Sequence, residues 1–273
     1  MPTETVEALD RLGARVVQMP GNLGFGAAVN RIAALARGDA LVILNDDLVT
    51  QDGFIASLVE HLDRAEMVAG VLVQAEQPDR IESAGIEVDV LLGPHDHLHG
   101  EPLSRLAEAL APPLGPCGGA AAFRRSSFGA VGGFDEALFA YCEDVDLALR
   151  LRAGGGRCAL APRALALHAG SSTLGYRSIE KARLVGFGRG YLLRKYGILR
   201  YPLIGPVALS VELAASLALA RRHHSLDPVL ARLHGWRSCS TRATRPPRSI
   251  ATVGLARGIG VRRSRSRRLA EQV

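Results

Sequence analysis

Short apolar runs of strand length alternate with helical segments in the first third of the chain. Residues 40–44 and 67–73 are compact apolar runs, whereas residues 24–36 are rich in alanine and place apolar side chains at helical spacing. A further helix is expected to begin at Asp52, whose side chain would cap it, and to continue to Leu62. This alternation predicts an α/β fold with a mixed, mostly parallel sheet flanked by helices.

The rest of the pattern is less regular. Residues 74–116 have weak periodicity and many turn-forming residues, which indicates a long excursion over the ligand-binding face of the sheet, with a short helix at residues 103–110. Further strands are expected at residues 14–19, 118–123 and 158–160, and further helices at residues 143–153 and 178–196.

Charge divides the chain into three parts. From residue 236 onward there are ten arginines and one acid, so the net charge of this tail is +9. The whole chain has a net charge of +6, so the net charge of residues 1–235 is −3. We therefore expect a globular domain over residues 1–200, an apolar helical region over residues 201–235 and a disordered tail over residues 236–273. The tail lacks the interleaved aromatic residues of a specific nucleic-acid site. The four cysteines follow no metal or disulfide pattern, and no signal peptide is visible, as is typical of a cytoplasmic protein.

The tripeptide Asn45-Asp46-Asp47 directly follows the apolar run at residues 40–44. A carboxylate just beyond a strand can hold a hard divalent cation, and the cation can hold a diphosphate. Acids at this position also cap the following helix or face solvent, so both interpretations stay open.

A glycine-rich turn, Gly21-Asn22-Leu23-Gly24-Phe25-Gly26, leads into the helix expected at residues 24–36. Its backbone N–H groups could approach a phosphate. The glycine spacing differs from the dinucleotide fingerprint, which argues against a nucleotide-dependent oxidoreductase. A tight turn that needs glycine only for its positive φ explains the pattern equally well.

Three acids, Glu143, Asp144 and Asp146, open the helix expected at residues 143–153. The helix dipole and an Asp146–Arg150 pair account for Asp146. They do not require both Glu143 and Asp144, and either carboxylate could act as a general base.

Histidines occur in two places that could matter. His168 follows an apolar stretch, where a histidine is more often structural than a ligand, although a neutral imidazole binds transition metals well. His95, His97 and His99 alternate in a stretch that is better explained as a solvated loop than as a metal site.

Five loose motifs occur in a specific order: Asn22-Leu23-Gly24-Phe25-Gly26 with Asn30, Leu44-Asn45-Asp46-Asp47, Gly132-Gly133-Phe134-Asp135-Glu136, Glu143-Asp144-Val145-Asp146-Leu147 with Arg150, and His168. Together they resemble the inverting glycosyltransferases of family 2, which have the GT-A fold, and within them the rhamnosyltransferase-like bacterial enzymes. The resemblance runs from about residue 5 to residue 200.

The resemblance implies a role for each motif. Asp47 and His168 would bind Mg²⁺ or Mn²⁺, Asp144 would be the catalytic base, and Glu143 would be the second candidate for that base. The donor would be bound by Asn22, Gly24, Gly26, Asn30, Asn45, Asp46, Gly118 and Gly119.

The implied reaction is a single displacement that inverts the anomeric carbon of a nucleotide-diphosphate sugar. Rhamnose is among the donor sugars that the resemblance suggests, and the acceptor would be a hydroxyl of a cell-envelope glycan or of a lipid-linked sugar. One departure is large: the family's first two strands, which hold the nucleoside, have no counterpart, so roughly 40 residues are expected to be missing. A non-catalytic remnant is therefore the alternative function.

The segment Tyr201–Ala220 has the length of a membrane-spanning helix, but Pro202, Pro206 and Glu212 weaken that interpretation. An interfacial helix with the arginine-rich tail on anionic lipid, at the inner face of the cell membrane, fits better. A helix packed on the domain is the alternative.

Overall fold

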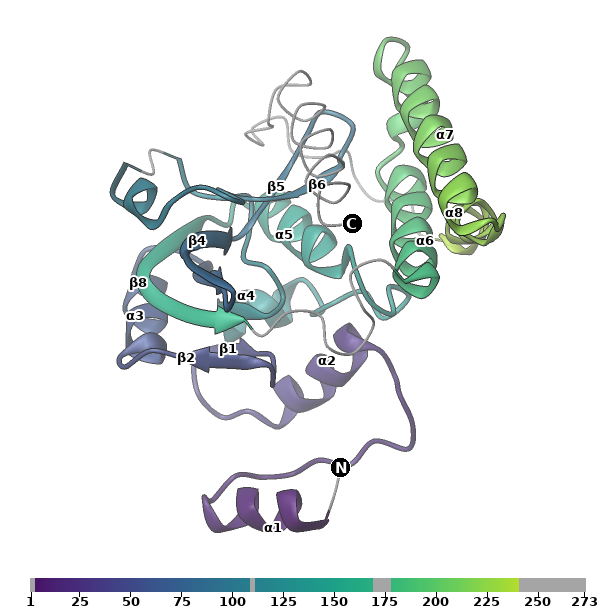
Figure 1. The fold of residues 1–273 in the computed structure, drawn as a ribbon. Helices are drawn as coiled ribbons and strands as arrows, with labels where there is room; N and C mark the ends of the chain where they lie inside the picture. The colour runs from purple at the N-terminus through teal and green to yellow at the C-terminus, as the bar shows by residue number, and fades with distance from the viewer. Residues whose placement is uncertain (1–2, 109–110, 169–177, 241–273) are drawn as a thin grey trace.

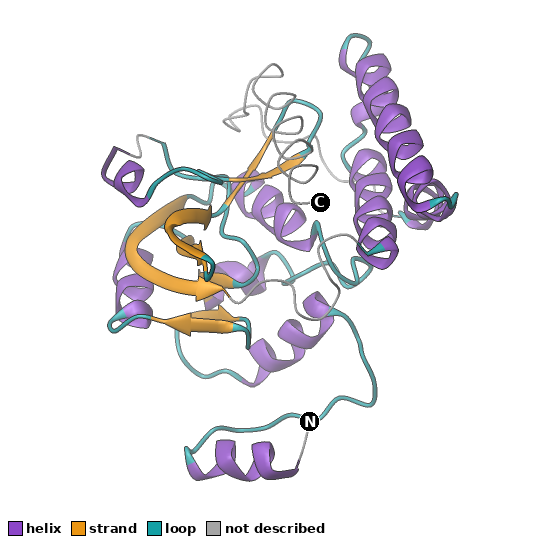
Figure 2. Cartoon of the chain, viewed as in Figure 1, coloured by secondary structure: helices purple, strands orange, loops and turns teal. Residues whose placement is uncertain are grey.

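A computed structural model describes residues 3–108, 111–168 and 178–240, and it contains a mixed sheet flanked by helices (Figures 1 and 2). The main sheet has the strand order β1-β7-β3-β8-β2, and β4 also pairs with β3. Its strands are β1 (Ala40–Leu44), β2 (Leu48–Thr50), β3 (Met67–Gln74), β4 (Gln77–Ser83), β7 (Ala120–Arg124) and β8 (Cys158–His168). A separate hairpin joins β5 (Ile86–Val88) to β6 (Pro94–Asp96).

The prediction of a mostly parallel sheet is wrong for the described strands, where β3 and β8 form the one parallel pair. The local alternation gave the relative direction of β1 and β3 correctly, since both run antiparallel to β7. It could not show that β7 inserts between them, because β7 arrives from much later in the chain.

The helices lie at α1 (Thr3–Arg11), α2 (Phe25–Leu35), α3 (Phe54–Glu60), α4 (Arg125–Ala130), α5 (Glu143–Ala153), α6 (Ile179–Lys195), α7 (Ile204–His223) and α8 (Asp227–Ser238), with short 3₁₀ turns at η1 (His61–Asp63), η2 (Leu103–Glu108) and η3 (Ile198–Arg200). The predicted helix at residues 143–153 is confirmed, and the one at residues 178–196 is α6 with Ser178 as its N-cap. Asp52 is not the cap of α3, because Gly53 takes that position in a left-handed conformation with φ 76°.

Three other predictions need correction. Residues 14–19 are irregular and pair with no strand in the part of the chain that the structure describes. Residues 74–116 contain β4, β5 and β6, which the weak periodicity concealed. The strand expected at residues 158–160 continues to His168, because its second half continues to pair with β3 and also pairs with β2.

The sheet curls back on itself. β1 and β2 lie at opposite ends of the strand order, yet only residues 45–47 separate them in sequence. Because so short a turn spans little distance, the two edges must approach each other. The curvature is carried by the long strand β8, and the pairing of β3 with β8 shifts register between Ala69 and Val71 (Figure 1).

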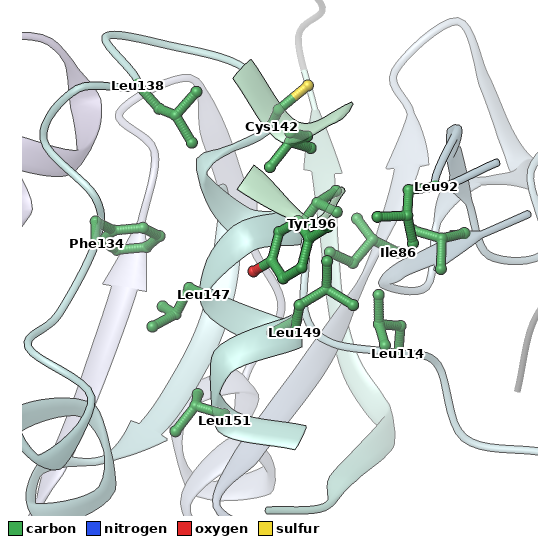
Figure 3. Packing of buried hydrophobic residues seen from close by; sticks show 14 of the residues in the cluster. Ile86, Leu92, Leu114, Phe134, Leu138, Cys142, Leu147, Leu149, Leu151 and Tyr196 are labelled. Carbon is green, nitrogen blue, oxygen red and sulfur yellow. The ribbon is translucent and has the colours of Figure 1, made fainter. Parts of the chain in front are cut away.

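Strand β3 divides the core. Met67 and Ala69 face one cluster with Leu147 and Leu149 of α5, and Figure 3 shows this packing around Tyr196. Val68 faces the other cluster, with Phe54 and Leu58 of α3 among its members. α5 and α3 thus cover opposite faces of the sheet.

The C-terminal region is helical. The apolar segment Tyr201–Ala220 lies largely in α7, which by length and composition is the described helix that could cross a membrane. Residue 236 lies inside α8 and not at the start of a tail. Residues 241–273, the rest of the predicted disordered tail, lie outside the described residues.

Candidate active site

The turn at residues 45–47 begins where β1 ends. The Asn45 N–H donates to the Gly119 carbonyl over 3.0 Å, which extends the pairing of Leu44 with Ala120. Gly119 lies directly against the Asn45 amide, since a Cβ added to Gly119 would lie 3.0 Å from Asn45 Nδ2. Asn45 and Gly119 are therefore neighbours, as the resemblance implied.

His168 lies between Asp47 of this turn and Glu82 of β4. His168 ends β8, next to Leu48 of β2, and its Nε2 lies 3.3 Å from Asp47 Oδ2. Its Nδ1 lies 2.8 Å from Glu82 Oε2 in β4. The other Asp47 oxygen, Oδ1, is buried and has no hydrogen-bond partner among the described residues.

Asp47 and Glu82 affect the pKa and the orientation of His168. The hydrogen bond to Glu82 is the main reason that the pKa of His168 is raised, although partial burial opposes it. Glu82 also fixes the ring so that Nε2 faces Asp47, as outer carboxylates do for metal-binding histidines. Sequence reasoning missed Glu82, because the residues around it were expected to be irregular.

Asp47 and His168 are two side chains that could contact a divalent cation, and the rest of its ligands would have to come from elsewhere. No group of three or more His, Cys, Asp or Glu side chains suitable for a metal was found in the described ranges. Asp47 and His168 are two such donors, and the unpartnered Asp47 Oδ1 is suited to a cation. Mg²⁺ commonly takes its other ligands from phosphate and water.

The second acidic group, Glu143 and Asp144, lies at the start of α5. Gly118 and Gly119 lie between this group and the turn at residues 45–47. Asp144 Oδ1 accepts the Val145 N–H over 2.8 Å, and the Gly118 backbone also bonds to this carboxylate. A Cβ added to Gly118 would lie 3.8 Å from Glu143 Oε1. Gly118 and Gly119 thus join the turn at residues 45–47 to the acidic pair Glu143–Asp144, and a side chain at either glycine would crowd this passage.

Burial raises the pKa of both members of the acidic pair. The pKa of Asp144 rises to about 6, with a contribution from Asp96 at the end of β6. The pKa of Glu143 rises to about 8, where the charge on Asp144 adds to the effect of burial. Glu143 Oε2 is buried and has no partner among the described residues. The pair therefore favours one ionised carboxylate, at Asp144, beside one protonated acid.

Asp146, by contrast, is structural. It is fully buried and lies 2.7 Å from both Arg150 Nε and Lys195 Nζ. Tyr196 donates to the same carboxylate over 3.0 Å. The ion pair with Arg150 that the sequence suggested is confirmed.

The glycine-rich turn at residues 21–26 is bonded to the segment that precedes α5. Gly24 has φ 84°, and the Phe25 N–H donates to the Phe139 carbonyl over 2.8 Å. The Gly24 N–H is bonded to the Asn22 side chain over 3.0 Å. These N–H groups are already used, which favours the tight-turn interpretation over a phosphate site.

Asn30 has a similar role. Its amide donates to the Phe134 carbonyl over 2.9 Å and accepts from the Phe134 N–H over 2.8 Å. Gly26 packs against Phe134, whose Cβ would lie 2.9 Å from a Cβ added there. These residues position the loop that precedes Glu143, while direct donor binding by Asn22, Gly24, Gly26 and Asn30 stays a prediction.

The three alternating histidines are not a solvated loop. His95 is buried and lies 3.1 Å from the buried carboxylate of Asp89, and His97 is buried beside Glu87. The expectation was wrong because the β5–β6 hairpin folds inward, so that His95 and His97 each meet an acid that sequence spacing did not reveal, whereas His99 Nδ1 bonds to the Glu82 carbonyl over 2.7 Å.

Comparisons with known proteins agree with this geometry. Residues 2–132 match the model of the family Glycosyl transferase family 2. The chain is 33% identical over 180 residues to the N-acetylglucosaminyl-diphospho-decaprenol L-rhamnosyltransferases of two Mycobacterium tuberculosis strains, CDC 1551 / Oshkosh and ATCC 25618 / H37Rv. The alignment covers 56% of this chain and 58% of each relative, so the chain spans little more than half the length of the curated relatives it matches.

Its fold is also similar to that of a solved structure, GalNAc-T7 with UDP, GalNAc and Mn²⁺. The TM-score is 0.54 at 15% identity, with 82% of this chain and 46% of the other covered. The chain therefore has the GT-A fold and is similar to glycosyl transferase family 2 over residues 2–132.

Proposed function

We propose that this chain is an inverting glycosyltransferase that moves a sugar from a nucleotide-diphosphate donor to a hydroxyl of a cell-envelope glycan or a lipid-linked acceptor. The observation that carries the proposal is the meeting of two acidic groups at one edge of the sheet. Asp47 with His168 and Asp144 with Glu143 come from distant parts of the sequence and are joined through Gly118 and Gly119.

Asp144 is the proposed base. A base works best when its pKa lies near the operating pH, and a value of about 6 leaves Asp144 mostly ionised at neutral pH. It takes the proton of the acceptor hydroxyl while that oxygen bonds to the anomeric carbon. The bond from this carbon to the diphosphate breaks, and the nucleoside diphosphate leaves. Glu143, protonated at the same pH, would donate a hydrogen bond and not compete for the proton.

Asp47 and His168 would hold Mg²⁺ or Mn²⁺, which supplies positive charge to the departing diphosphate. Glu82 would keep His168 oriented for this role. The backbone of residues 118–119 leaves room for the donor sugar, because neither glycine carries a side chain.

The donor sugar and acceptor are proposed from the relatives. Their names specify transfer of L-rhamnose to N-acetylglucosaminyl-diphospho-decaprenol. We propose a rhamnosyl donor and a polyprenyl-diphosphate acceptor for this chain as well, and such an acceptor would bring the enzyme to the cytoplasmic surface of the cell membrane.

The test is a panel of dTDP-, UDP- and GDP-sugars with Mg²⁺ or Mn²⁺ and a polyprenyl-diphospho-N-acetylglucosamine acceptor. Release of nucleoside diphosphate together with a product of inverted anomeric configuration supports the proposal. Donor binding by calorimetry without transfer to any acceptor would favour a non-catalytic relative. Retention of configuration would exclude the single displacement.

A further inference from the structure

Helix α7 presents four large apolar side chains outward and the polar side chains of Glu212 and Ser216 inward. Val207, Leu209, Leu213 and Leu217 are 40%, 48%, 53% and 58% exposed. A helix on the surface of a water-soluble domain normally has the opposite arrangement.

The inward face of α7 holds the buried polar residues Glu212 and Ser216. Glu212 accepts from Arg189 of α6 over 2.6 Å and from Arg232 of α8 over 2.9 Å. Burial alone would raise the pKa of Glu212, but the two guanidinium groups lower it. Turning α7 to bury its leucines would separate this trio, so the orientation of the helix is fixed.

The same trio argues against a spanning helix. In the bilayer core, Glu212, Arg189 and Arg232 would all be brought into hydrocarbon, which is costly even for paired charges. A helix lying flat in the interface needs only one apolar face. Figure 1 shows α7 in the C-terminal helical group, to one side of the curled sheet.

The charges near the outward face match an anionic lipid surface. From residue 204 to residue 220, Glu212 is the single charged residue, and it points inward. Arg221 and Arg222 follow at once and are exposed. The segment from residue 236 onward adds ten arginines against one acid. Juxtamembrane basic clusters of this kind bind anionic headgroups.

We propose that the outward face of α7 (Val207, Leu209, Leu213 and Leu217) inserts into the headgroup region of an anionic membrane. The helix then lies parallel to the surface, with its arginines on the lipid headgroups. Leu226, the N-cap residue of α8, and Leu230 and Leu233 within α8 are further exposed apolar residues in these C-terminal helices.

This docking surface is connected to the candidate site. Arg189 donates to Glu212 and also to the carbonyls of Leu91 and Leu92 in the β5–β6 hairpin. The same hairpin carries Asp96, which acts on Asp144. Membrane docking would therefore hold the hairpin side of the site towards an acceptor embedded in lipid, a consequence that rests on the proposed function.

The test is flotation of the full chain with vesicles of phosphatidylcholine alone and vesicles containing phosphatidylglycerol. The wild type is expected to float with the anionic vesicles. Leu209→Gln/Leu213→Gln/Leu217→Gln should weaken partitioning by about tenfold or more. The matched control is Ile32→Gln/Leu35→Gln/Ile55→Gln, which alters apolar residues of 53%, 42% and 54% exposure on α2 and α3 and should float like the wild type.

A second measurement reports insertion directly. Leu213→Trp in a Trp236→Phe background should be quenched by lipids with brominated acyl chains, whereas an Ile55→Trp counterpart should not. Unchanged flotation of the triple α7 variant, or no quenching, overturns the proposal. Loss of a dimer in sedimentation equilibrium with unchanged flotation would assign the face to a second copy of the chain instead. Neither measurement needs donor or acceptor, so both are independent of the transfer assay.

Discussion

Two clusters of ionisable side chains in this chain shift the pKa values of their carboxyl groups in opposite directions. In the C-terminal helices, Glu212 is held between Arg189 and Arg232, and the pKa of Glu212 is lowered while that of Arg189 is raised. At the start of α5, Glu143 and Asp144 are close to each other, and both pKa values are raised. The first cluster therefore favours the ionised forms of its side chains, whereas the second favours the protonated forms of its carboxyl groups.

The difference separates a structural role from a chemical one. A buried charge that is fully paired holds elements in place, and removing one partner leaves an uncompensated ion. A buried carboxylate without a cation costs stability, and such groups concentrate at sites where proton transfer is needed. The unfavourable pair Glu143–Asp144 therefore supports the catalytic role that we propose for Asp144.

The largest expected effect is on the acidic pair. Asp144→Asn should lower transfer by about a thousandfold, because the amide cannot accept the acceptor proton. Its stability should stay equal or rise, since a buried charge is removed. Initial rates and urea unfolding measure the two effects, with the exposed Asp63→Asn as control. Full activity in Asp144→Asn would contradict the catalytic role that we propose for Asp144.

Breaking the paired cluster should affect folding. Glu212→Ala should lower the free energy of unfolding by about 3–5 kcal/mol, because Arg189 is left buried without its acid. Glu60 forms a similar bond with Arg163, also 2.6 Å long, but at the exposed surface. Glu60→Ala is therefore the control and should cost much less. Equal losses in urea unfolding would show that burial does not distinguish the two pairs.

The histidine beside Asp47 should respond to Glu82. Glu82→Gln should lower the pKa of His168, because the hydrogen-bonded carboxylate is its main cause, and should weaken metal-supported transfer about ten- to a hundredfold. Proton NMR titration measures the pKa. Glu87→Gln, which alters the acid beside His97, should leave His168 unchanged. A His168 pKa that does not move in Glu82→Gln contradicts the assignment.

The smallest effect is on pH dependence, and there activity and stability should diverge. The folded pKa values of about 6 for Asp144 and about 8 for Glu143 exceed the ordinary values of 3.8 and 4.5. At a pH between the ordinary and the folded pKa of each group, the folded state therefore binds more protons than the unfolded state. The free energy of unfolding should therefore increase as pH falls from 8 to 5.5. His168, whose pKa is also raised, acts in the same direction.

Transfer should fall over the same range, as Asp144 becomes protonated. Glu212 contributes nothing to this window, because its lowered pKa affects stability only below its ordinary value of 4.5. Urea midpoints and kcat/KM at each pH measure the two trends. Glu143→Gln/Asp144→Asn should remove most of the stability change. A double variant with the wild-type slope would assign that slope to other groups.

Local sequence pattern predicted the elements whose cause is local. Residues 40–44 and 143–153 form the expected strand and helix, because their apolar spacing and acidic start are visible in the sequence. The direction of β7 and the full length of β8 depend on pairing between distant segments, which spacing does not encode.

The candidate site divides in the same way. Asp47, Asp144 and His168 lie in short motifs, which made them candidates from the sequence. Glu82 and Asp96 come from β4 and β6, in the stretch expected to be irregular, and only the folded chain brings them to the site. Lys195 and Tyr196, which hold Asp146, were missed for the same reason.

The curl of the sheet has a consequence for how the site could open. The turn at residues 45–47 joins β1 to β2 across the two edges of the sheet, and His168 sits where β2 pairs with β8. Detaching β2 would therefore carry Asp47 away from His168 and release the edge of β8 in one event. Amide hydrogen exchange at residues 48–50 and 166–168 should then occur together, as a single opening that separates Asp47 from His168 and leaves the start of α5 intact.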